Sequence, residues 1–371
     1  MMGCASQAAK TVSSEAAVAA PAVPAFVPPT AQKPMLLCFN ENPLGMSAAA
    51  KKAVAAAAEK GSRYPFARVA AVKQALAQYM GGKPENILLT HGSAEAIRAS
   101  IEAYKVPGVQ VVAPELTYSD GTDTAKKNDM KVTRVKMGPD WSIDLEGMKK
   151  AVASYKGPSI VYFVNPNNPT STIVDSEKLL EWIRSKPART VFVVDEAYRE
   201  FVADPTFKSA KTLVDEGCDN VIVLRTFSKI FAMAGMRLGF AYAAPETINQ
   251  VRRHVAYEVM MSVTALDAAL AELADKDFLE FSRAQNEEAR TILTKALDEL
   301  GIAYLPSQTN FVFMNLKAPL QPFADRMKAE HILVGRPFPP ALTWCRVSLG
   351  TPAETAYFVK KLFEFRVKGW V

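Results

Sequence analysis

The sequence contains few cysteines and few histidines, and neither type is clustered. Among its 371 residues are four cysteines and three histidines, namely Cys4, Cys38, Cys218, Cys345, His91, His254 and His331. Disulfide frameworks and zinc sites need such residues at close, regular spacings, for example in Cys-x-x-Cys pairs. No such spacing is present, so the sequence predicts reduced thiols and no metal site.

Long apolar runs are also missing. No stretch of about 18 apolar residues occurs, so we expect no transmembrane helix. Residues 2–5, Met-Gly-Cys-Ala, resemble the end of a bacterial lipoprotein signal, but the charged and apolar regions that precede such a site are absent. We therefore predict a cytoplasmic protein, with the remnant of an export signal as the alternative.

Charge is not concentrated in any part of the chain. The net charge is +6, and the 44 basic residues are scattered among 38 acidic ones. A mildly basic enzyme that holds anionic ligands explains this balance, and no nucleic-acid-binding motif accompanies it. We expect no nucleic-acid partner. Apolar residues make up 49% of the chain, which allows a sizeable globular core.

The first part of the chain differs in composition from the rest. Residues 5–34 are rich in Ala, Val, Pro, Ser and Thr, a mixture that does not build a packed element. We expect residues 1–34 to form a disordered arm. Residues 35–60 are expected to join a small domain, residues 61–247 to form a large domain, and residues 248–371 to form the small C-terminal domain.

Short apolar strands alternate with amphipathic helices along the predicted large domain. Strands are predicted at 87–89, 109–113, 131–135, 159–164, 190–194, 220–224 and 239–243, and helices at 48–59, 69–80, 93–104, 145–154, 176–185 and 208–216. This alternation predicts an α/β fold with a largely parallel sheet covered on both faces.

Beyond Pro245 the pattern changes to long helices, predicted at 248–261 and 265–300. Shorter elements follow at 310–315, 322–330 and 345–349, and a helix at 353–366 closes the chain. Helices with a few strands favour a second, smaller α+β domain.

Polar motifs follow the predicted strands, where α/β folds place their sites. The first is His91-Gly92-Ser93-Ala94-Glu95. A glycine turn into a helix N-terminus presents free N–H groups to an anion. A plain helix cap is the alternative interpretation of this motif.

Two further motifs follow the strands predicted at 159–164 and 190–194. Residues 165–170 read Asn-Pro-Asn-Asn-Pro-Thr, and the two prolines hold the asparagine side chains in place. A surface turn is the alternative. Asp195 ends an apolar strand, so its carboxylate is expected to be buried beside a cation or donor, with Tyr198 within reach. A helix-start aspartate is the alternative.

A lysine follows the next strand. Lys229 ends the segment Arg-Thr-Phe-Ser-Lys, and a lysine flanked by hydroxyls and apolar side chains is suited to covalent chemistry with carbonyl compounds. Arg237 comes eight residues later, after Gly235, and an arginine can grip a phosphate with a two-pronged contact. Taken singly, a lysine is usually a solvated surface residue, but the combination indicates a cofactor site.

Together these motifs resemble those of the fold-type I, class I/II aminotransferases that depend on pyridoxal 5'-phosphate (PLP). The similarity is greatest to the histidinol-phosphate aminotransferase branch and covers about residues 38–371. Besides the loop and strand-end motifs above, it includes residues 39–43, 63–65, 307–311 and 346–351 in family order, with Trp141 between them. It implies a large domain with a mostly parallel sheet sandwiched by helices, a smaller α+β domain, and PLP as cofactor.

The resemblance also implies roles in cofactor binding. Lys229 is expected to carry the cofactor as a Schiff base and to move the substrate proton, and Asp195 to pair with the ring nitrogen. Further cofactor contacts are implied for Asn168 and Tyr198 at the ring hydroxyl, Tyr118 on the ring face, and Ser93, Ala94, Thr226, Ser228 and Arg237 at the phosphate. Tyr64 is expected to reach the phosphate from a neighbouring subunit, which implies a homodimer with shared active sites.

Three residues are implied on the substrate side. Arg346 is expected to clamp a substrate carboxylate, Arg336 to meet a second substrate anion, and Asn42 to contact the substrate. The implied activity is transfer of an amino group from an amino acid, or from histidinol phosphate, to a 2-oxo acid such as 2-oxoglutarate.

The sequence departs from the family pattern at two places. Ser171 follows Thr170 where the family has glycine, so serine is either tolerated there or adds a hydroxyl near the site. The segment 25–29, Ala-Phe-Val-Pro-Pro, lacks the tyrosine that helps histidinol-phosphate enzymes hold the substrate phosphate. A plain amino acid is therefore as good a candidate donor as histidinol phosphate.

Two other functions remain as alternatives at this point. Relatives with the same cofactor residues oxidise an amino acid with oxygen instead of transaminating it. A non-catalytic PLP-binding protein is the remote alternative, and the joint presence of Lys229, Asp195 and Arg346 speaks against it.

Overall fold

The structure, a computed structural model, describes residues 20–371. Its helices are α1 (Ala48–Ala58), α2 (Phe66–Met80), α3 (Ser93–Glu102), α4 (Asp120–Lys127), α5 (Leu145–Ala153), α6 (Ser176–Arg184), α7 (Lys211–Asp215), α8 (Pro245–Arg252), α9 (Val263–Ala274), α10 (Lys276–Glu299), α11 (Leu320–Ala329) and α12 (Pro352–Val367). Its strands are β1 (Met35–Leu37), β2 (Ile87–Thr90), β3 (Gln110–Pro114), β4 (Lys131–Val135), β5 (Ser159–Val164), β6 (Thr190–Asp195), β7 (Val221–Thr226), β8 (Gly239–Ala243), β9 (Phe311–Asn315), β10 (Ile332–Val334) and β11 (Trp344–Ser348).

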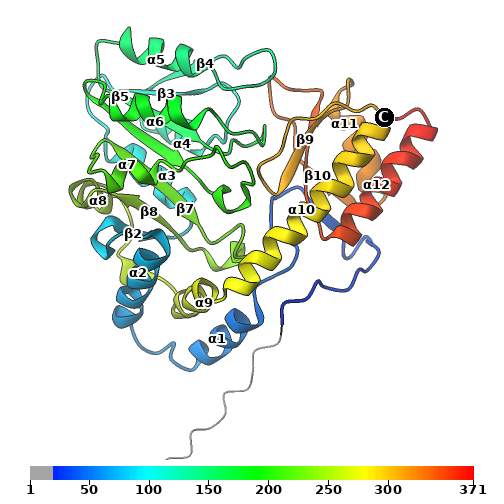
Figure 1. Cartoon of the computed structure of the whole chain (residues 1–371), viewed down its shortest axis with the longest axis horizontal. Helices are drawn as coiled ribbons and strands as arrows, with labels where there is room; N and C mark the ends of the chain where they lie inside the picture. The colour runs from blue at the N-terminus through cyan, green and yellow to red at the C-terminus, as the bar shows by residue number, and fades with distance from the viewer. Residues whose placement is uncertain (1–19) are drawn as a thin grey trace, which may run out of the picture.

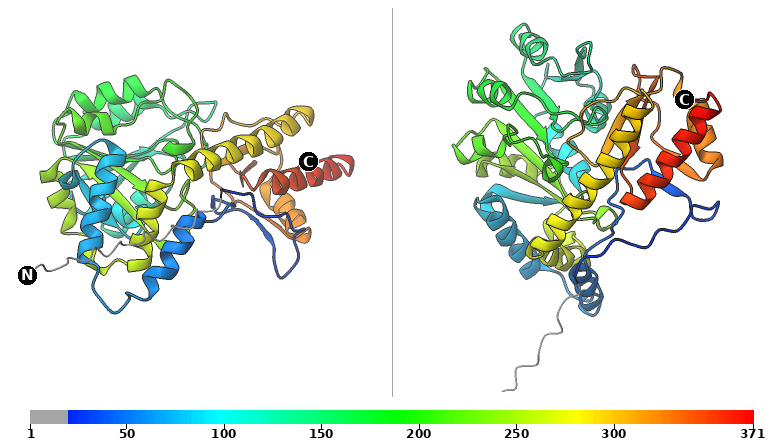
Figure 2. Two further views of the ribbon diagram at one scale, coloured as in Figure 1. Left: turned by 60° about the horizontal axis from the view of Figure 1, so that its bottom comes forward. Right: turned by 45° about the vertical axis from the view of Figure 1, so that its right-hand side comes forward.

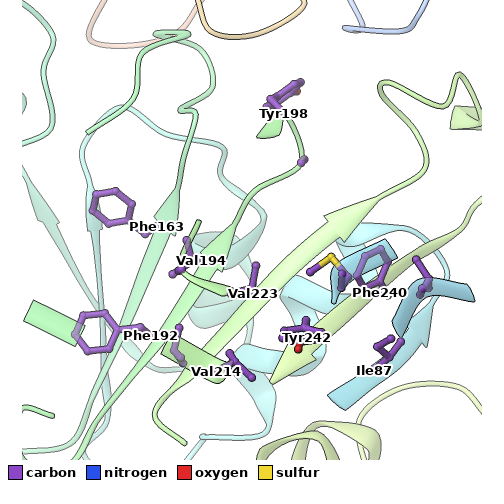
Figure 3. Close-up of a cluster of buried hydrophobic side chains, with 14 of the residues drawn as sticks. Ile87, Phe163, Phe192, Val194, Tyr198, Val214, Val223, Phe240 and Tyr242 are labelled. Carbon is purple, nitrogen blue, oxygen red and sulfur yellow. The ribbon is translucent and has the colours of Figure 1, made fainter. Parts of the chain in front are cut away.

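Seven strands form one sheet in the order β2-β8-β7-β6-β5-β3-β4, and all run parallel except β8. Helices α3, α4 and α8 pack on one face and α2, α5, α6, α7 and α9 on the other (Figure 1). Figure 3 shows part of the core between the sheet and α2, α5, α6, α7 and α9, where Phe163, Phe192 and Val194 project from neighbouring strands. Strands buried on both faces are apolar along their length. The predicted α/β fold is confirmed.

A smaller part with its own core lies beside this sheet. Strand β9 pairs antiparallel with β11, and β1 pairs parallel with β10. Apolar side chains of α10, α11 and α12 pack against these strands. Figures 1 and 2 show this part projecting to one side, with α10 running between it and the large part. The N-terminal strand β1 belongs to the smaller core, whereas α1 packs against α9.

Two predicted helices are corrected. The helix predicted at 248–261 ends at Arg252, and the Glu258 carboxylate accepts a hydrogen bond from the Leu89 amide at 2.9 Å instead of continuing the helix. The helix predicted at 265–300 is broken at Asp275, whose side chain accepts from the Phe278 amide at 2.9 Å and caps α10. Helical periodicity continues across both positions, so it does not reveal the breaks. Three short elements, α4, β1 and β10, were not predicted.

The described part of the predicted N-terminal arm, residues 20–34, contacts the rest of the protein. Residues 20–34 form no helix or strand, as their composition predicts, but the Phe26 ring lies 5.5 Å from the Tyr357 ring of α12. This apolar contact attaches residues 20–34 to the smaller part, so the prediction of disorder is wrong there. The lipoprotein-like segment, residues 2–5, lies outside the described residues. The predicted domain boundaries stay predictions.

Within residues 20–371, no helix combines the length and the apolar character needed to cross a bilayer. The same residues contain no group of three or more His, Cys, Asp or Glu side chains placed to hold a metal ion. The thiols of Cys38, Cys218 and Cys345 are unpaired. The cytoplasmic location stays a prediction.

Candidate active site

The carboxyl ends of β5, β6 and β7 open into a cavity of about 490 Å³. Both parts of the molecule line it, with these residues among others: Phe39, Asn40, Ser93, Ala94, Tyr118, Asn168, Asp195, Tyr198, Ser228, Lys229, Arg237, Arg336, Phe338 and Arg346. Most of the residues expected to bind cofactor and substrate therefore face one space. This is the position at which parallel α/β sheets bind ligands.

Asp195 forms the buried floor of the cavity. It is the last residue of β6, pairs in register with Val164 of β5, and is 3% exposed. Burial raises the pKa of Asp195 to about 7; the Ala197 amide, which donates to Oδ1 at 3.1 Å, opposes this, as does Lys229, while Asp120 reinforces it. A carboxylate placed in this way favours a positively charged partner in the cavity.

The loop at 165–170 is held rigidly, as its prolines predict. The Asn167 amide donates to the Leu116 carbonyl at 3.0 Å and to Thr170 Oγ1 at 2.9 Å, and its oxygen accepts from Thr117 at 2.7 Å. These buried bonds leave the neighbouring Asn168 side chain to face the cavity. The interpretation as a plain surface turn is wrong.

Ser171 takes the backbone conformation for which the family uses glycine. Its φ is +64°, a left-handed conformation that is costly for a residue with a Cβ. Its hydroxyl donates to the adjacent Thr170 carbonyl at 2.5 Å, and its own carbonyl accepts from the Gln308 amide at 2.8 Å. Ser171 is buried and does not line the cavity, so serine is tolerated here and adds no hydroxyl to the site.

The glycine turn before α3, together with Gly239, forms a cradle at one end of the cavity in which backbone and the Arg237 side chain approach closely. A Cβ on Gly92 would lie 2.5 Å from Nη2 of Arg237, and a Cβ on Gly239 would lie 2.7 Å from the Ser93 nitrogen. The amides of Ser93 and Ala94, at the start of α3, donate no hydrogen bond to any of residues 20–371. Free amides at a helix N-terminus beside a guanidinium form an anion site.

One of the two hydroxyls expected at the phosphate, that of Ser228, faces this anion site, whereas that of Thr226 does not. Thr226 Oγ1 donates to Ser228 Oγ at 2.9 Å and accepts from the Ser228 amide at 3.1 Å. Ser228 also lines the cavity, whereas Thr226 stands behind it and fixes the Ser228 hydroxyl.

A buried ion cluster, which sequence reasoning missed, lies next to these strand ends. Arg225 of β7 contacts Glu200 at 2.6 Å and Glu196 at 3.0 Å, and all three side chains are almost fully buried. Glu196 also accepts from Ser209 Oγ at 2.6 Å. Because Glu196 follows Asp195 and Arg225 precedes Thr226, the ion pairs hold the ends of β6 and β7 together. The only sequence signal was charge next to two motifs.

Lys229 extends into the cavity from the loop after β7. Its Nζ donates to the Asn40 carbonyl at 3.0 Å and lies 5.5 Å from the centre of the Tyr198 ring. Lys229 is thus held between the N-terminal segment and the strand ends. It is not a solvated surface residue.

Tyr198 is fixed by two amides. Its hydroxyl accepts from Asn40 Nδ2 at 3.1 Å and from Asn168 Nδ2 at 3.5 Å. Asn40 belongs to the family motif at residues 39–43, but the resemblance implied no role for it. Asn42, expected to contact substrate, does not line the cavity, because its amide donates to the Ile230 carbonyl at 3.0 Å and to Ser282 Oγ at 2.7 Å. The structure gives Asn42 a supporting role and places Asn40 at the site.

Two arginines from the smaller part form the wall opposite. Arg346 on β11 donates to Asn168 Oδ1 at 2.8 Å and to the Cys38 carbonyl at 2.6 Å, and its Nε is buried and has no partner among the described residues. Arg336 is more exposed, and its guanidinium lies 4.5 Å from the Phe338 ring. The Arg346 guanidinium lies 5.0 Å from the same Phe338 ring.

Tyr118 lines the cavity, and burial beside Asp120 raises the pKa of its hydroxyl well above the usual value. Tyr64, in contrast, is 80% exposed and does not line the cavity of its own chain.

The sequence and the fold are similar to those of known proteins. The model of the family "Aminotransferase class I and II" matches residues 32–362. The chain belongs to this family.

Several relatives of this aminotransferase are histidinol-phosphate aminotransferases. Those of Symbiobacterium thermophilum and Moorella thermoacetica are 35% and 32% identical to it, over 87% and 88% of this chain and 88% and 84% of theirs. A crystal structure from Erwinia carotovora atroseptica superposes with a TM-score of 0.92 at 49% identity, covering 94% of this chain and all of that one. The Sinorhizobium meliloti histidinol-phosphate aminotransferase, solved with pyridoxal-5'-phosphate, gives 0.80 at 27% identity over 88% and 91%.

These similarities establish PLP-dependent amino-group transfer as the function and do not favour the oxidase alternative. The residues of this aminotransferase fit the cofactor. The glycine cradle, with its free amides beside Arg237, suits a phosphate, the buried Asp195 suits a protonated ring nitrogen, and Lys229 lines the same cavity.

The burial of Asp195 predicts a pH-dependent cost in the cofactor-free aminotransferase. The Asp195 carboxyl has a pKa of about 7 in the folded chain against 3.8 ordinarily, a difference of roughly 4 kcal/mol at about 1.36 kcal/mol for each pH unit. Between these pH values the folded state keeps a proton that the unfolded state loses. Unfolding free energy contributed by this group therefore falls as pH rises from about 4 to about 7.

We expect the stability advantage of the Asp195→Asn apoprotein over wild type to grow from about 1 kcal/mol near pH 4.5 to a few kcal/mol at pH 8, measured by urea unfolding. Asp277→Asn, which removes an exposed carboxylate on α10, is the control and should keep the wild-type pH dependence. If the difference in unfolding free energy between Asp195→Asn and wild type does not change with pH, the raised pKa of Asp195 is contradicted.

Proposed function

We propose that this aminotransferase passes the amino group to a 2-oxo acid such as 2-oxoglutarate, whose carboxylate binds Arg346. The buried Arg346 guanidinium, facing the same cavity as Lys229 and holding an unpartnered Nε, is the observation that supports this. A planar guanidinium matches a carboxylate with two parallel, charge-assisted hydrogen bonds.

The remaining roles follow from position. When bound, PLP supplies an electron sink for the carbanion formed as the donor loses its α-proton. Nζ of Lys229 takes that proton, since it is a basic group that lines the cavity with Asp195 and Tyr198. Asp195 holds the proton on the ring nitrogen, and Tyr198, fixed by Asn40 and Asn168, binds the ring hydroxyl. Tyr118 covers the ring face.

The donor is proposed to be an amino acid rather than histidinol phosphate alone. The segment 25–29 offers no hydroxyl, and none of residues 20–34 lines the cavity because Phe26 packs on Tyr357. Arg336 remains as one contact for a second anion of the substrate. The relatives named above carry the name histidinol-phosphate aminotransferase, so this donor is the direct comparison.

A homodimer is proposed as the working unit. Tyr64, Phe66, Tyr257 and Met260 are large apolar side chains that are more than three-fifths exposed. Phe66 and Tyr257 also line one concavity of about 290 Å³. Exposed aromatic side chains of this kind mark protein interfaces. In such a dimer Tyr64 reaches the cofactor phosphate of the neighbouring subunit.

Lys229 should carry the cofactor covalently. Borohydride reduction of the holoenzyme followed by peptide mapping should place the label on Lys229, and Lys229→Ala should fold but lose transamination. Lys126→Ala, which changes an exposed lysine, should behave as wild type. A label on another peptide would refute the assignment.

Arg346→Lys should raise the KM for 2-oxoglutarate about tenfold or more, because lysine cannot give two parallel bonds. Steady-state kinetics with wild type should also show that histidinol phosphate is no better than an amino acid of similar size. A preference of about a hundredfold, roughly 2.7 kcal/mol, for histidinol phosphate would overturn the donor proposal. An unchanged KM in Arg346→Lys would overturn the carboxylate contact.

Sedimentation should report a dimer, and Tyr64→Phe should weaken PLP binding by removing a phosphate donor. Tyr155→Phe removes a hydroxyl that donates to the Gly108 carbonyl, away from the cavity and from the exposed aromatic side chains named above, and should leave PLP affinity unchanged. A fully active monomer would rule out shared active sites.

A further inference from the structure

A buried tyrosine that no role above uses lies on the same face of the central sheet as Asp195. Tyr162 is on β5, its side chain is 0% exposed, and its hydroxyl makes no hydrogen bond within residues 20–371. Val164, two residues later on the same strand, pairs with Asp195 and lines the cavity. Side chains alternate between faces along a strand, so Tyr162, Val164 and Asp195 share one face of the sheet.

The fold makes room for this ring. A Cβ on Gly121, in the first turn of α4, would lie 2.7 Å from two atoms of the Tyr162 ring. Any side chain at position 121 would displace the ring, so glycine on α4 and tyrosine on β5 are complementary. Strand β5 thus buries the Tyr162 ring against α4, and the ring carries a polar hydroxyl.

The groups around the hydroxyl are mainly acidic. Burial raises the pKa of Tyr162 far above its usual value; Asp195, Asp120 and Tyr118 reinforce the effect, and the backbone of Gly121 opposes it. The hydroxyl therefore keeps its proton, and towards a carboxylate it acts as a donor. Asp195 Oδ1 accepts only the Ala197 amide among the described residues and can take a second donor.

We propose that Tyr162 is a positioning residue for Asp195, whose ionised carboxylate it holds towards the cofactor ring nitrogen by donating a hydrogen bond. The proposal rests on the ring-nitrogen role of Asp195. A buried donor without an acceptor is costly, and an ionised Asp195 carboxylate, on the same face of the sheet, is an acceptor that would remove this cost. Charge on Asp195 is opposed by Asp120 on α4 and by Glu196, and is favoured by Lys229. Tyr162 adds a neutral donor to this balance.

The test is Tyr162→Phe in the holoenzyme, which removes the hydroxyl and keeps the ring against Gly121. We expect PLP affinity and kcat each to fall about tenfold, while the KM for 2-oxoglutarate, which depends on Arg346, stays within about twofold. The unfolding midpoint of the apoprotein should stay equal or rise, because an unpartnered hydroxyl has been removed.

Tyr242→Phe is the matched control. Tyr242 is a buried tyrosine on β8 whose hydroxyl donates to Asp215 at 2.7 Å, away from the cavity. Its loss should lower the unfolding midpoint and leave PLP affinity and kcat unchanged. If Tyr162→Phe instead keeps wild-type affinity and kcat, the hydroxyl is a structural orphan and the proposal is overturned.

Asp195→Asn separates this proposal from the one on which it rests. If Asp195→Asn keeps wild-type PLP affinity and kcat, the ring-nitrogen role of Asp195 fails. If Asp195→Asn is impaired, Tyr162→Phe should add no further loss in that background, because its hydroxyl acts through the carboxylate. Additive losses in the double variant would show that Tyr162 acts independently of Asp195 and would overturn the positioning role.

Discussion

The carboxylate of Asp195 is buried at the end of the central strand β6, and a buried negative charge is unfavourable unless positive charge or donors surround it. In the cofactor-free chain the pKa of this carboxyl is raised to about 7, since burial and Asp120 outweigh the Ala197 amide and Lys229. In the role proposed for Asp195, a protonated pyridine nitrogen would supply the missing positive charge. The buried carboxylate, unfavourable in the empty site, would then become favourable when the ring binds, and cofactor binding would stabilise the site.

The position of that carboxylate depends on a second set of buried charges. Arg225, Glu196 and Glu200 are nearly fully enclosed, and their ion pairs join the ends of β6 and β7. Breaking a buried pair leaves an uncompensated charge, so the two strand ends cannot easily shift relative to each other. Asp195 and Thr226, which adjoin this cluster, are held in place by it. Neighbouring residues therefore have different functions: Asp195 faces the cavity, whereas Glu196 belongs to the ion cluster that holds the strand end.

The site is also divided between the two parts of the molecule. The large part supplies Asp195, Lys229 and the glycine cradle, while Arg346 and Arg336 come from the smaller part. Asn40 joins them, because its amide donates to Tyr198 and its carbonyl accepts from Lys229. The strand β1, just before Asn40, belongs to the smaller core. Cofactor residues and substrate residues thus meet only when both cores are formed.

Local patterns in the sequence were enough to locate the strands and the residues at their ends, because apolar runs of four to six residues and polar motifs are short-range features. They identified Asp195, Lys229, Arg237 and Arg346 and the α/β fold. Other features depend on contacts between distant segments. The Glu258 carboxylate bonds to the Leu89 amide instead of continuing a helix. The Asn42 amide bonds to Ser282, whereas Asn40 faces the site. The Phe26 ring packs on Tyr357. Burial of Tyr162 against Gly121 belongs with these, since neither residue carries a motif and only packing of α4 on β5 brings them together.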